Sequence, residues 1–284
     1  MTGAMEEHPL GAYLRARRDL VRPEHVGLPS GPHRRVPGLR REEVAMLAGI
    51  STDYYLRLER GRDIHPSVQV LESLARALQL DDVERRYLLD LGAPKPRRPR
   101  RRRQEHVPDR VHHLLAAIDA PAFVEGRWFD VLAVNDLAAT LSPRLRPGEN
   151  RIRSFFLDPE ERALYEDWER SAAAIVATLR IAVGDDVEDP RFAELVGELS
   201  LRSERFRMLW ARHDVRPLVG GVARLQHPTV GGLELYREKL PLEDDLIVVI
   251  YYAAPGSASA EKLQLLASLA RTVDAPRADA EQPG

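Results

Sequence analysis

The chain has 284 residues, of which 44% are hydrophobic and 30% charged, a balance typical of a globular protein of one or two domains. Cysteine is absent, which excludes disulfide staples, thiolate metal sites and cysteine nucleophiles. The net charge of −2 conceals an asymmetry, because residues 1–108 hold 21 Lys+Arg against 15 Asp+Glu and the remainder holds 21 against 29. A basic part joined to an acidic part suggests that the first part binds a polyanion.

The N-terminal third is expected to form a small all-α bundle. Apolar residues recur at helical spacing behind Pro9, and a Gly-, Pro- and Arg-rich loop follows to about Leu39. Residues 93–108 are rich in Pro and Arg, which predicts an extended basic linker that could follow DNA phosphates. The domain is therefore placed at residues 1–92. Its further helices are predicted at about 41–48, 51–60, 67–79 and 81–91.

The middle of this basic part has the local features of a helix-turn-helix. Such a motif needs a small residue where its two helices touch, a residue tolerant of positive φ in the turn, and an N-cap for the second helix. Ala45, Gly49 and Ser51 supply these three features in register. The residues expected to be buried between the helices are Ile50, Tyr55 and Leu58.

This segment resembles the helix-turn-helix of the xenobiotic-response-element type, whose pattern ends in Glu-x-Gly as residues 59–61 do. The resemblance extends over about residues 9–92 and implies that a recognition helix at Ser51–Arg60 enters the major groove of a double-stranded DNA operator. Arg40 and Arg41 become candidate phosphate anchors, although Gln is commoner in the family at position 41. The candidate DNA-binding residues are Arg40, Arg41, Ser51, Thr52, Asp53, Tyr54, Arg57 and Arg60.

Residues 109–273 are predicted to form an α+β domain, because runs of strands and runs of helices are segregated along the chain. A tail at residues 274–284 is polar and is expected to be disordered. A short hairpin is expected from Ala122–Val124 and Trp128–Asn135. The later elements are predicted as helices at about 160–182 and 189–213, strands at about 218–226, 231–240 and 246–253, and a helix at about 258–272.

The second half resembles the MmyB-like transcription regulators, whose C-terminal domain is a PAS-like sensor with a hydrophobic tunnel. The match runs from about Pro121 to Leu269 and rests on four segments that begin at Trp128, Arg151, Asp189 and Leu225. The resemblance implies a small amphiphilic effector, a fatty acid in first place. No other cofactor and no metal are expected.

Six polar or aromatic residues are candidates for contacting such a ligand, and each also has an ordinary structural interpretation. Asn135 precedes a helix-like segment that it could cap, and Arg153 could either bind a carboxylate head group or cover a hydrophobic edge. His213 ends an apolar stripe that begins at Phe206. The candidate ligand-binding residues are Asn135, Arg153, Tyr165, Trp168, Trp210 and His213.

The expected function is therefore a transcriptional regulator that binds DNA as a homodimer and senses an amphiphile. No apolar run approaches the roughly 18 residues of a membrane-spanning helix, so a cytoplasmic protein without a membrane partner is expected. There is no nucleophile elbow, phosphate-binding glycine loop or HExxH motif, which argues against an enzyme. One alternative makes the second half a ligand-free module for dimerisation or protein interaction. A second alternative is an enzyme with regulation through DNA added to it.

Overall fold

The structure is a computed structural model that describes residues 8–29, 34, 36–62, 65–93, 105–183, 189–216, 220–243 and 245–274. The chain divides into two compact units. The first contains Met1–Arg101 and Ala173–Pro217, and the second contains Arg102–Ala172 and Leu218–Gly284. The predicted linker at 93–108 and the predicted tail at 274–284 lie for the most part outside the described residues.

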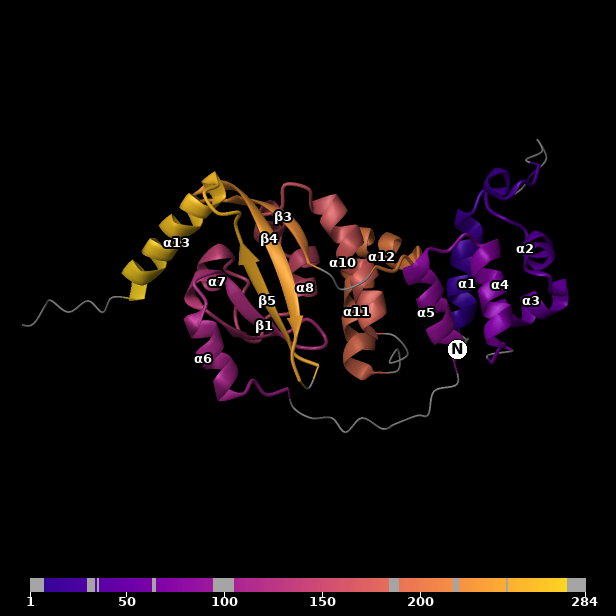
Figure 1. The fold of residues 1–284 in the computed structure, drawn as a ribbon, viewed down its shortest axis with the longest axis horizontal. Helices are drawn as coiled ribbons and strands as arrows, with labels where there is room; N and C mark the ends of the chain where they lie inside the picture. Colours follow the sequence, from indigo (N-terminus) through magenta and orange to yellow (C-terminus); the bar gives the residue numbers. More distant parts are fainter. Residues whose placement is uncertain are drawn as a thin grey trace, which may run out of the picture. The chain divides into compact units, whose positions relative to one another are not determined.

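The N-terminal part of the first unit is a bundle of short helices (Figure 1). Each predicted helix is present, with ends that differ by at most two residues from the prediction. Leu10, Tyr13 and Leu14 from the first helix are fully buried against the rest of the bundle. The elements are α1 (Pro9–Leu20), the 3-10 helix η1 (Pro23–Val26), α2 (Arg41–Ala48), α3 (Thr52–Glu59), α4 (Val68–Ala77) and α5 (Asp82–Gly92).

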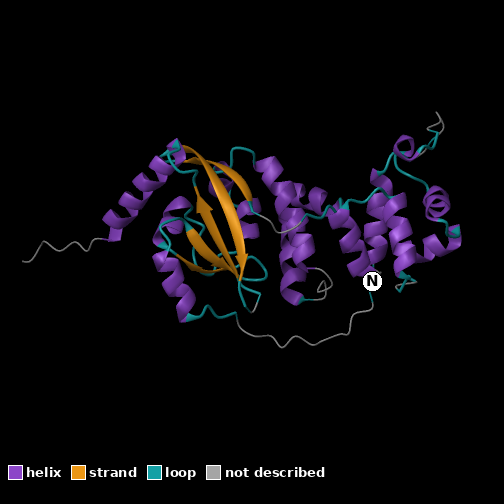
Figure 2. Ribbon diagram, viewed as in Figure 1, coloured by secondary structure: helices purple, strands orange, loops and turns teal. Residues whose placement is uncertain are grey.

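The second unit is built on a five-stranded antiparallel sheet with the strand order β2-β1-β5-β4-β3 (Figure 2). The predicted α+β class is confirmed. The strands are β1 (Ala122–Glu125), β2 (Val131–Val134), β3 (Gly221–His227), β4 (Gly231–Pro241) and β5 (Ile247–Tyr252). The helices of this unit are α6 (Asp109–Ala117), α7 (Asp136–Leu141), α8 (Arg151–Leu157), α9 (Pro159–Ala163) and α13 (Ala258–Asp274).

Each face of this sheet has its own hydrophobic cluster. On one face, Val111 and Leu115 of α6 pack with Val124 and Val248. On the other face, residues of α7 and α13 pack with apolar side chains of all five strands. That second cluster contains Phe123, Val131, Ala138, Leu141, Leu145, Leu225, Leu233, Leu235, Val249, Tyr251, Leu263 and Leu266. The sheet therefore separates two cores, with α6 and α13 on opposite sides.

The predicted second strand of the first hairpin is too long. Trp128 and Phe129 precede the observed strand β2, and they lie in a turn in which the Gly126 amide donates to the Asp130 carbonyl at 2.9 Å. Phe129 has a φ of +67°, which is incompatible with a strand. The apolar run continues through the turn because Trp128 and Phe129 are both buried.

The two long helices predicted in the second half are each divided, so both predictions are wrong in extent. In the first, α9 ends at Ala163 and α10 (Trp168–Val183) begins five residues later. Between them the chain pairs with β3, since the Glu166 amide donates to the Arg224 carbonyl at 3.1 Å and the Gln226 amide to the Leu164 carbonyl at 2.7 Å. This strand-like pairing interrupts the helical hydrogen bonds.

The second division falls at Ser203, between α11 (Pro190–Arg202) and α12 (Glu204–Ala211). The Ser203 hydroxyl accepts a hydrogen bond from the Phe206 amide at 3.2 Å and so caps the new helix. Both helices, with α10 from Ala173 onward, belong to the first unit. Among the described residues, no helix is both long enough and apolar enough to span a membrane.

Candidate functional site

The turn between α2 and α3 has the geometry that the sequence predicts. Gly49 has a φ of +68°, and a Cβ added there would meet no atom within 4 Å, so backbone conformation alone requires glycine. The Ile50 amide donates to the Ala45 carbonyl at 3.0 Å. Ser51 caps α3 by accepting a hydrogen bond from the Tyr54 amide at 3.1 Å. Tyr55 is fully buried beneath α3, as expected.

The outer surface of α3, which we call the α3 face, carries most of the predicted DNA contacts. Asp53 and Arg57 form an i,i+4 ion pair of 2.7 Å, and the Arg57 guanidinium lies 5.4 Å from the centre of the Tyr54 ring. Both partners of the ion pair are exposed, so it contributes little to stability and costs little to break. The α3 face consists of Ser51, Thr52, Asp53, Arg57 and Arg60, all exposed, with Tyr54 half-buried beside them.

A buried carboxylate joins three helices behind the α3 face. Glu59, the last residue of α3, is 1% exposed and accepts hydrogen bonds from Arg18 Nε and Arg41 Nε, both at 2.6 Å. Burial by itself would raise the pKa of Glu59, but the two guanidinium groups hold it below its ordinary value. Arg41 is therefore both a predicted phosphate anchor and part of this cluster. The sequence did not reveal the pairing, because its partners come from separate helices.

The start of α2 is fixed by a second carboxylate that sequence reasoning missed. Glu43 accepts from the Arg40 backbone amide at 2.7 Å and from two nitrogens of Arg34 at 2.8 and 2.5 Å. The hydrogen bonds from Arg34 keep the pKa of Glu43 below its ordinary value. The Arg40 side chain stays exposed. A DNA phosphate near this helix start would meet the Arg40 side chain.

A groove of about 1120 Å³ lies in the second unit where the end of α6, the start of α7, the end of β5 and α13 meet, and we call it the α6–α13 groove. Its volume is slightly above the roughly 300–1,000 Å³ typical of small-molecule sites. The lining is mainly apolar, and Asp119 and Asp136 are exposed carboxylates among it. The lining residues are Leu115, Ala116, Ile118, Asp119, Ala120, Asn135, Asp136, Leu137, Tyr252, Ala253, Ala260, Leu263, Gln264, Ala267, Ser268 and Ala270.

Asn135 is the one predicted ligand residue among those that line the α6–α13 groove. Its side-chain oxygen accepts from the Ala138 amide at 2.9 Å, which caps α7, and from the Ala122 amide at 3.0 Å. Its amide nitrogen donates to the Ala120 carbonyl at 2.8 Å and the Ile118 carbonyl at 3.2 Å. Asn135 therefore holds the wall of the groove in place, and the capping interpretation of this residue is confirmed.

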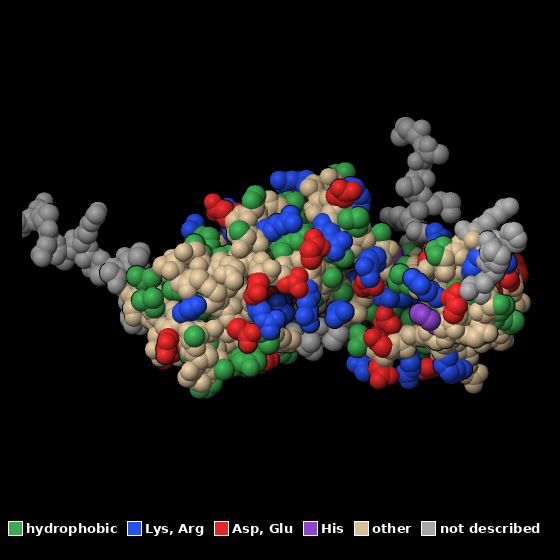
Figure 3. All heavy atoms as spheres, turned by 90° about the horizontal axis from the view of Figure 1, so that it is seen from above, with side chains coloured by type: hydrophobic (Ala, Val, Ile, Leu, Met, Phe, Trp, Pro, Cys, Tyr) green, Lys and Arg blue, Asp and Glu red, His purple; other side chains and the backbone are tan. Residues whose placement is uncertain are grey.

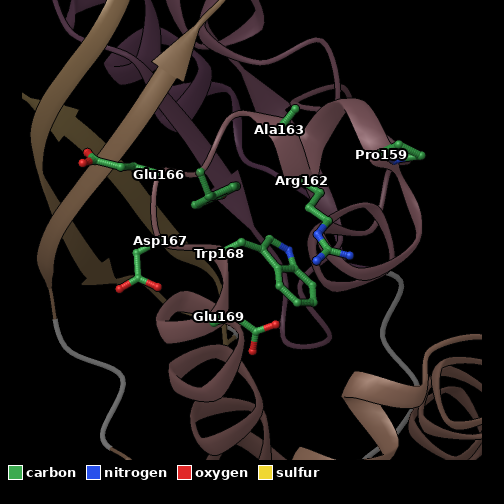
Figure 4. A pocket seen from close by; sticks show the side chains of 8 residues that line it. Pro159, Arg162, Ala163, Glu166, Asp167, Trp168 and Glu169 are labelled. Carbon is green, nitrogen blue, oxygen red and sulfur yellow. The ribbon is translucent and has the colours of Figure 1, made fainter.

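Tyr165 and Trp168 line a separate, smaller pocket of about 470 Å³, together with Arg162 (Figure 4). The Arg162 guanidinium lies 4.1 Å from the centre of the Trp168 ring, and the Trp168 indole donates to the Phe155 carbonyl at 3.1 Å. The Tyr165 hydroxyl accepts from Arg151 at 3.2 Å. Burial raises the pKa of Tyr165 above its ordinary value. Both aromatic rings pack tightly against Phe155.

The remaining three predicted ligand residues lie in neither pocket. Arg153 is half-buried on α8, where its backbone amide donates to Asn150 at 3.0 Å. Trp210 and His213 belong to the first unit. The six candidates therefore lie in different parts of the structure. Asn135 is the one of the six that lines the α6–α13 groove. Sequence reasoning missed the rest of its lining because α6 and α13 are about 140 residues apart in the chain.

The capped turn, the exposed α3 face and the separate domain with a groove define the class of DNA-binding transcription regulators. A family model described as a helix-turn-helix domain matches residues 9–88. A second, described as the MmyB-like transcription regulator ligand binding domain, matches residues 107–266, more than half of the chain. The chain belongs to the MmyB-like transcription regulators. No curated protein matches it.

Proposed function

We propose that this chain binds a specific operator duplex through the α3 face as a homodimer and that a small amphiphile bound to its second half regulates this binding. The proposal rests mainly on the exposed α3 face, which belongs to a helix-turn-helix whose turn and N-cap have the expected geometry. The N-terminal end of α3 would read base edges with Ser51, Thr52, Asp53 and Tyr54. We assign no catalytic step to the chain.

The arginines near the α3 face would bind phosphates and bases. Arg40 and Arg41 stand at the start of α2, where backbone amides also favour an anion, and they would anchor phosphates. Arg57 would exchange its ion pair with Asp53 for a contact to DNA, and Arg60 would reach the backbone at the end of α3. A guanidinium suits both a phosphate and a guanine edge.

The operator can be obtained by selecting duplexes from a randomised pool with the full chain. We expect the combined substitution Arg41→Ala and Arg57→Ala to raise the Kd for the selected duplex by more than about ten-fold, on the order of 1–3 kcal/mol per lost contact. Arg85→Ala is the matched control, because Arg85 of α5 pairs with Glu72 of α4 and belongs to neither α2 nor α3. An unchanged Kd in the folded double variant would place the DNA-binding surface elsewhere.

The α6–α13 groove supports the amphiphile part of the proposal, in a domain that we take to be PAS-like. Its apolar floor, with Leu115, Ile118 and Leu263, suits an acyl chain. Family resemblance favours a fatty acid. However, Asp119 and Asp136 are carboxylates at the rim, and among the described lining residues none is Lys or Arg, which favours an uncharged head group.

Mass spectrometry of an organic extract of the purified protein tests for a retained ligand. Thermal shifts with C12–C18 acids and with the alcohols of the same chain lengths then separate the two kinds of head group. Ala267→Trp should fill the groove and abolish the shift, whereas Ala163→Trp in the pocket beside Trp168 should preserve it. If no ligand is extracted and no compound shifts the transition, the ligand-free interaction module is the better account.

Dimerisation is proposed because one small helix-turn-helix rarely supplies the contact area of a tight and specific complex. Two copies would address half-sites one helical turn apart, and the ligand would shift the relative placement of the two copies. Light scattering of the full chain, alone and with the selected duplex, measures the number of copies. A single copy on the duplex would contradict this part of the proposal.

A further inference from the structure

Residues 213–215 follow α12 in the sequence, yet they pack in the N-terminal bundle, and we call them the latch segment. Val215 is 5% exposed and belongs to the same buried cluster as Leu10, Leu14 and Leu88. Ile181 of α10 packs against this cluster as well. The latch segment lies inside the range that matches the ligand-binding family model, residues 107–266. A piece of the ligand-binding domain is thus part of the core of the DNA-binding bundle.

Arg17 of α1 binds the latch segment both at a backbone carbonyl and at a side-chain carboxylate. Arg17 Nη2 donates to the His213 carbonyl at 2.9 Å, and Nη1 lies 3.4 Å from the Asp214 carboxylate. The same Nη1 pairs with Glu84 of α5 at 2.9 Å. The Arg17 side chain is only 9% exposed, so these interactions are shielded from solvent. Arg17 therefore connects α1, α5 and the latch segment.

Arg180 of α10 holds the same segment from the other side. Its Nη1 lies 3.0 Å from His213 Nδ1, its Nη2 donates to the Trp210 carbonyl, and its guanidinium is 3.8 Å from the centre of the Trp210 ring. Burial lowers the pKa of Arg180 to about 10. His213 has a φ of +53°, a conformation that is rare for residues other than glycine. The backbone is held in this conformation by contacts from two helices.

Helix α1 also contacts the end of the recognition helix. Arg18, the residue after Arg17, bonds to Glu59 at 2.6 Å, and a Cβ added at Gly11 would lie 2.4 Å from the Glu59 carbonyl. α1 and the end of α3 are therefore in close contact without space for a side chain between them. One helix thus contacts the latch segment through Arg17 and α3 through Arg18.

We infer that the latch segment is a docking element by which the ligand-binding domain controls the position of α3 through α1. α10 supplies the connection along the chain, because it is one uninterrupted helix whose residues Trp168–Ala172 belong to the second unit and whose remainder belongs to the first. A ligand-induced change in the second unit that is transmitted along α10 would release or seat Val215, and the Arg17–Arg18 pair would carry the change to Glu59. The regulatory part of this inference rests on the proposed function.

The test uses the full chain and compares Val215→Asp with Val222→Asp. Val222 lies on β3 and is 52% exposed, so it receives the same chemical change without burial. We expect Val215→Asp to increase amide hydrogen exchange at least five-fold in both α1 and α3, and Val222→Asp to leave exchange there unchanged. We also expect Val215→Asp to raise the Kd for the selected duplex at least about five-fold. Equal exchange and equal Kd in the two variants would overturn the inference.

Should Val215→Asp prevent folding, a double-mutant cycle of Arg17→Gln and Asp214→Asn replaces it. We expect the two substitutions to change exchange in α3 non-additively, and strictly additive effects would overturn the inference. The exchange measurement needs neither DNA nor ligand, so it remains informative if the proposed function fails. Palmitate and the C16 alcohol are the probes for regulation. The one that shifts the thermal transition of the wild type should alter the Kd of the wild type and of Val222→Asp but not that of Val215→Asp.

Discussion

The stability of the N-terminal helix bundle depends more on its buried charged side chains than on its exposed ones. Glu59 has two arginine partners and essentially no contact with solvent, whereas Asp53 and Arg57 pair on the surface. A buried charge that loses its partners cannot be rehydrated, so breaking such a group costs far more than breaking a surface pair. Some arginines of this chain therefore hold helices together and others are available to DNA, and Arg41, which is half exposed and bonded to Glu59, has both properties.

Glu59→Gln should destabilise the bundle by about 3 kcal/mol, because it removes the buried counter-charge of Arg18 and leaves only the exposed Asp19 to pair with it. Glu72→Gln is the control and should cost less than about 1 kcal/mol, since its pair with Arg85 is exposed. Because the pKa of Glu59 is lowered on folding, its stabilisation is present above the ordinary carboxyl pKa and is lost as the pH falls through the lowered value. Urea unfolding at several pH values measures both effects, and equal losses in the two variants would refute the assignment.

His213 gives a second pH dependence. Burial, with Arg180 and Arg17 nearby, lowers its pKa to about 3, so folding favours the neutral imidazole. Stability should therefore decline as the pH falls from about 6.5 toward 3, since the unfolded chain binds the proton more readily. Asp214 and Glu84 are the carboxylates near this group. His213→Asn, which tolerates the positive φ, should flatten this decline, and exposed His25→Asn should not; parallel curves would exclude His213 as the cause.

Among the secondary-structure elements, those that were predictable from sequence depend on local signals. Gly49 and Ser51 determine the turn and the start of α3 by their own conformation and hydrogen bonding, so their spacing was sufficient to place the helix-turn-helix. The break after Ala163 depends on pairing with β3, some 60 residues away, which no local periodicity encodes. The break at Ser203 did have a local signal, the N-cap serine, inside an otherwise continuous apolar pattern.

The candidate DNA-binding surface was predictable for the same reason, and the groove was not. The α3 face lies on one short helix, so the residue spacing of the helix-turn-helix motif is enough to identify its residues. The α6–α13 groove gathers residues from α6, α7, β5 and α13, and only Asn135 carried a recognisable pattern. Phe206, Leu209 and Trp210 of the predicted stripe lie on α12, but His213 lies beyond the end of that helix with a φ of +53°, so its placement on the helix was wrong. Its partners Arg17 and Arg180 come from elsewhere in the chain.

Two glycines test whether backbone conformation governs the turn. Gly49→Ala should cost about 1–2 kcal/mol, because φ is +68° there and free space around the Cβ cannot relieve that strain. Gly197→Ala, on the exposed side of α11 with no atom near its Cβ, should instead stabilise by about 0.5–1 kcal/mol. Thermal unfolding of the two variants should show shifts of opposite sign. Shifts of the same sign would mean that the turn is not held in the left-handed conformation.

At the scale of the whole molecule, the near-neutral net charge is the sum of a basic N-terminal part and an acidic remainder. Acidic and basic side chains are nevertheless interspersed on the face shown in Figure 3. The arginines on and near the α3 face are expected to determine DNA binding. The contact between residues 213–215 and the bundle shows that the two family domains are not independent modules.

Operator affinity should fall steeply with salt, since each phosphate contact releases counterions and adds about −0.9 to the slope of log K against log salt. Arg40→Ala should make the slope shallower by about one unit if Arg40 binds a phosphate. Arg85→Ala should leave it unchanged. Titrations at four salt concentrations measure the slopes, and identical slopes for Arg40→Ala and the wild type would remove Arg40 from the interface.

The most direct test of ligand-responsive DNA binding is the Kd of the full chain for its selected duplex, measured before and after extraction of the bound amphiphile and again after that extract is added back. We predict a change of at least about five-fold on extraction, in the range of ordinary allosteric coupling, and its reversal on addition. The same Kd in all three states, with mass spectrometry confirming removal and rebinding of the ligand, would contradict the account.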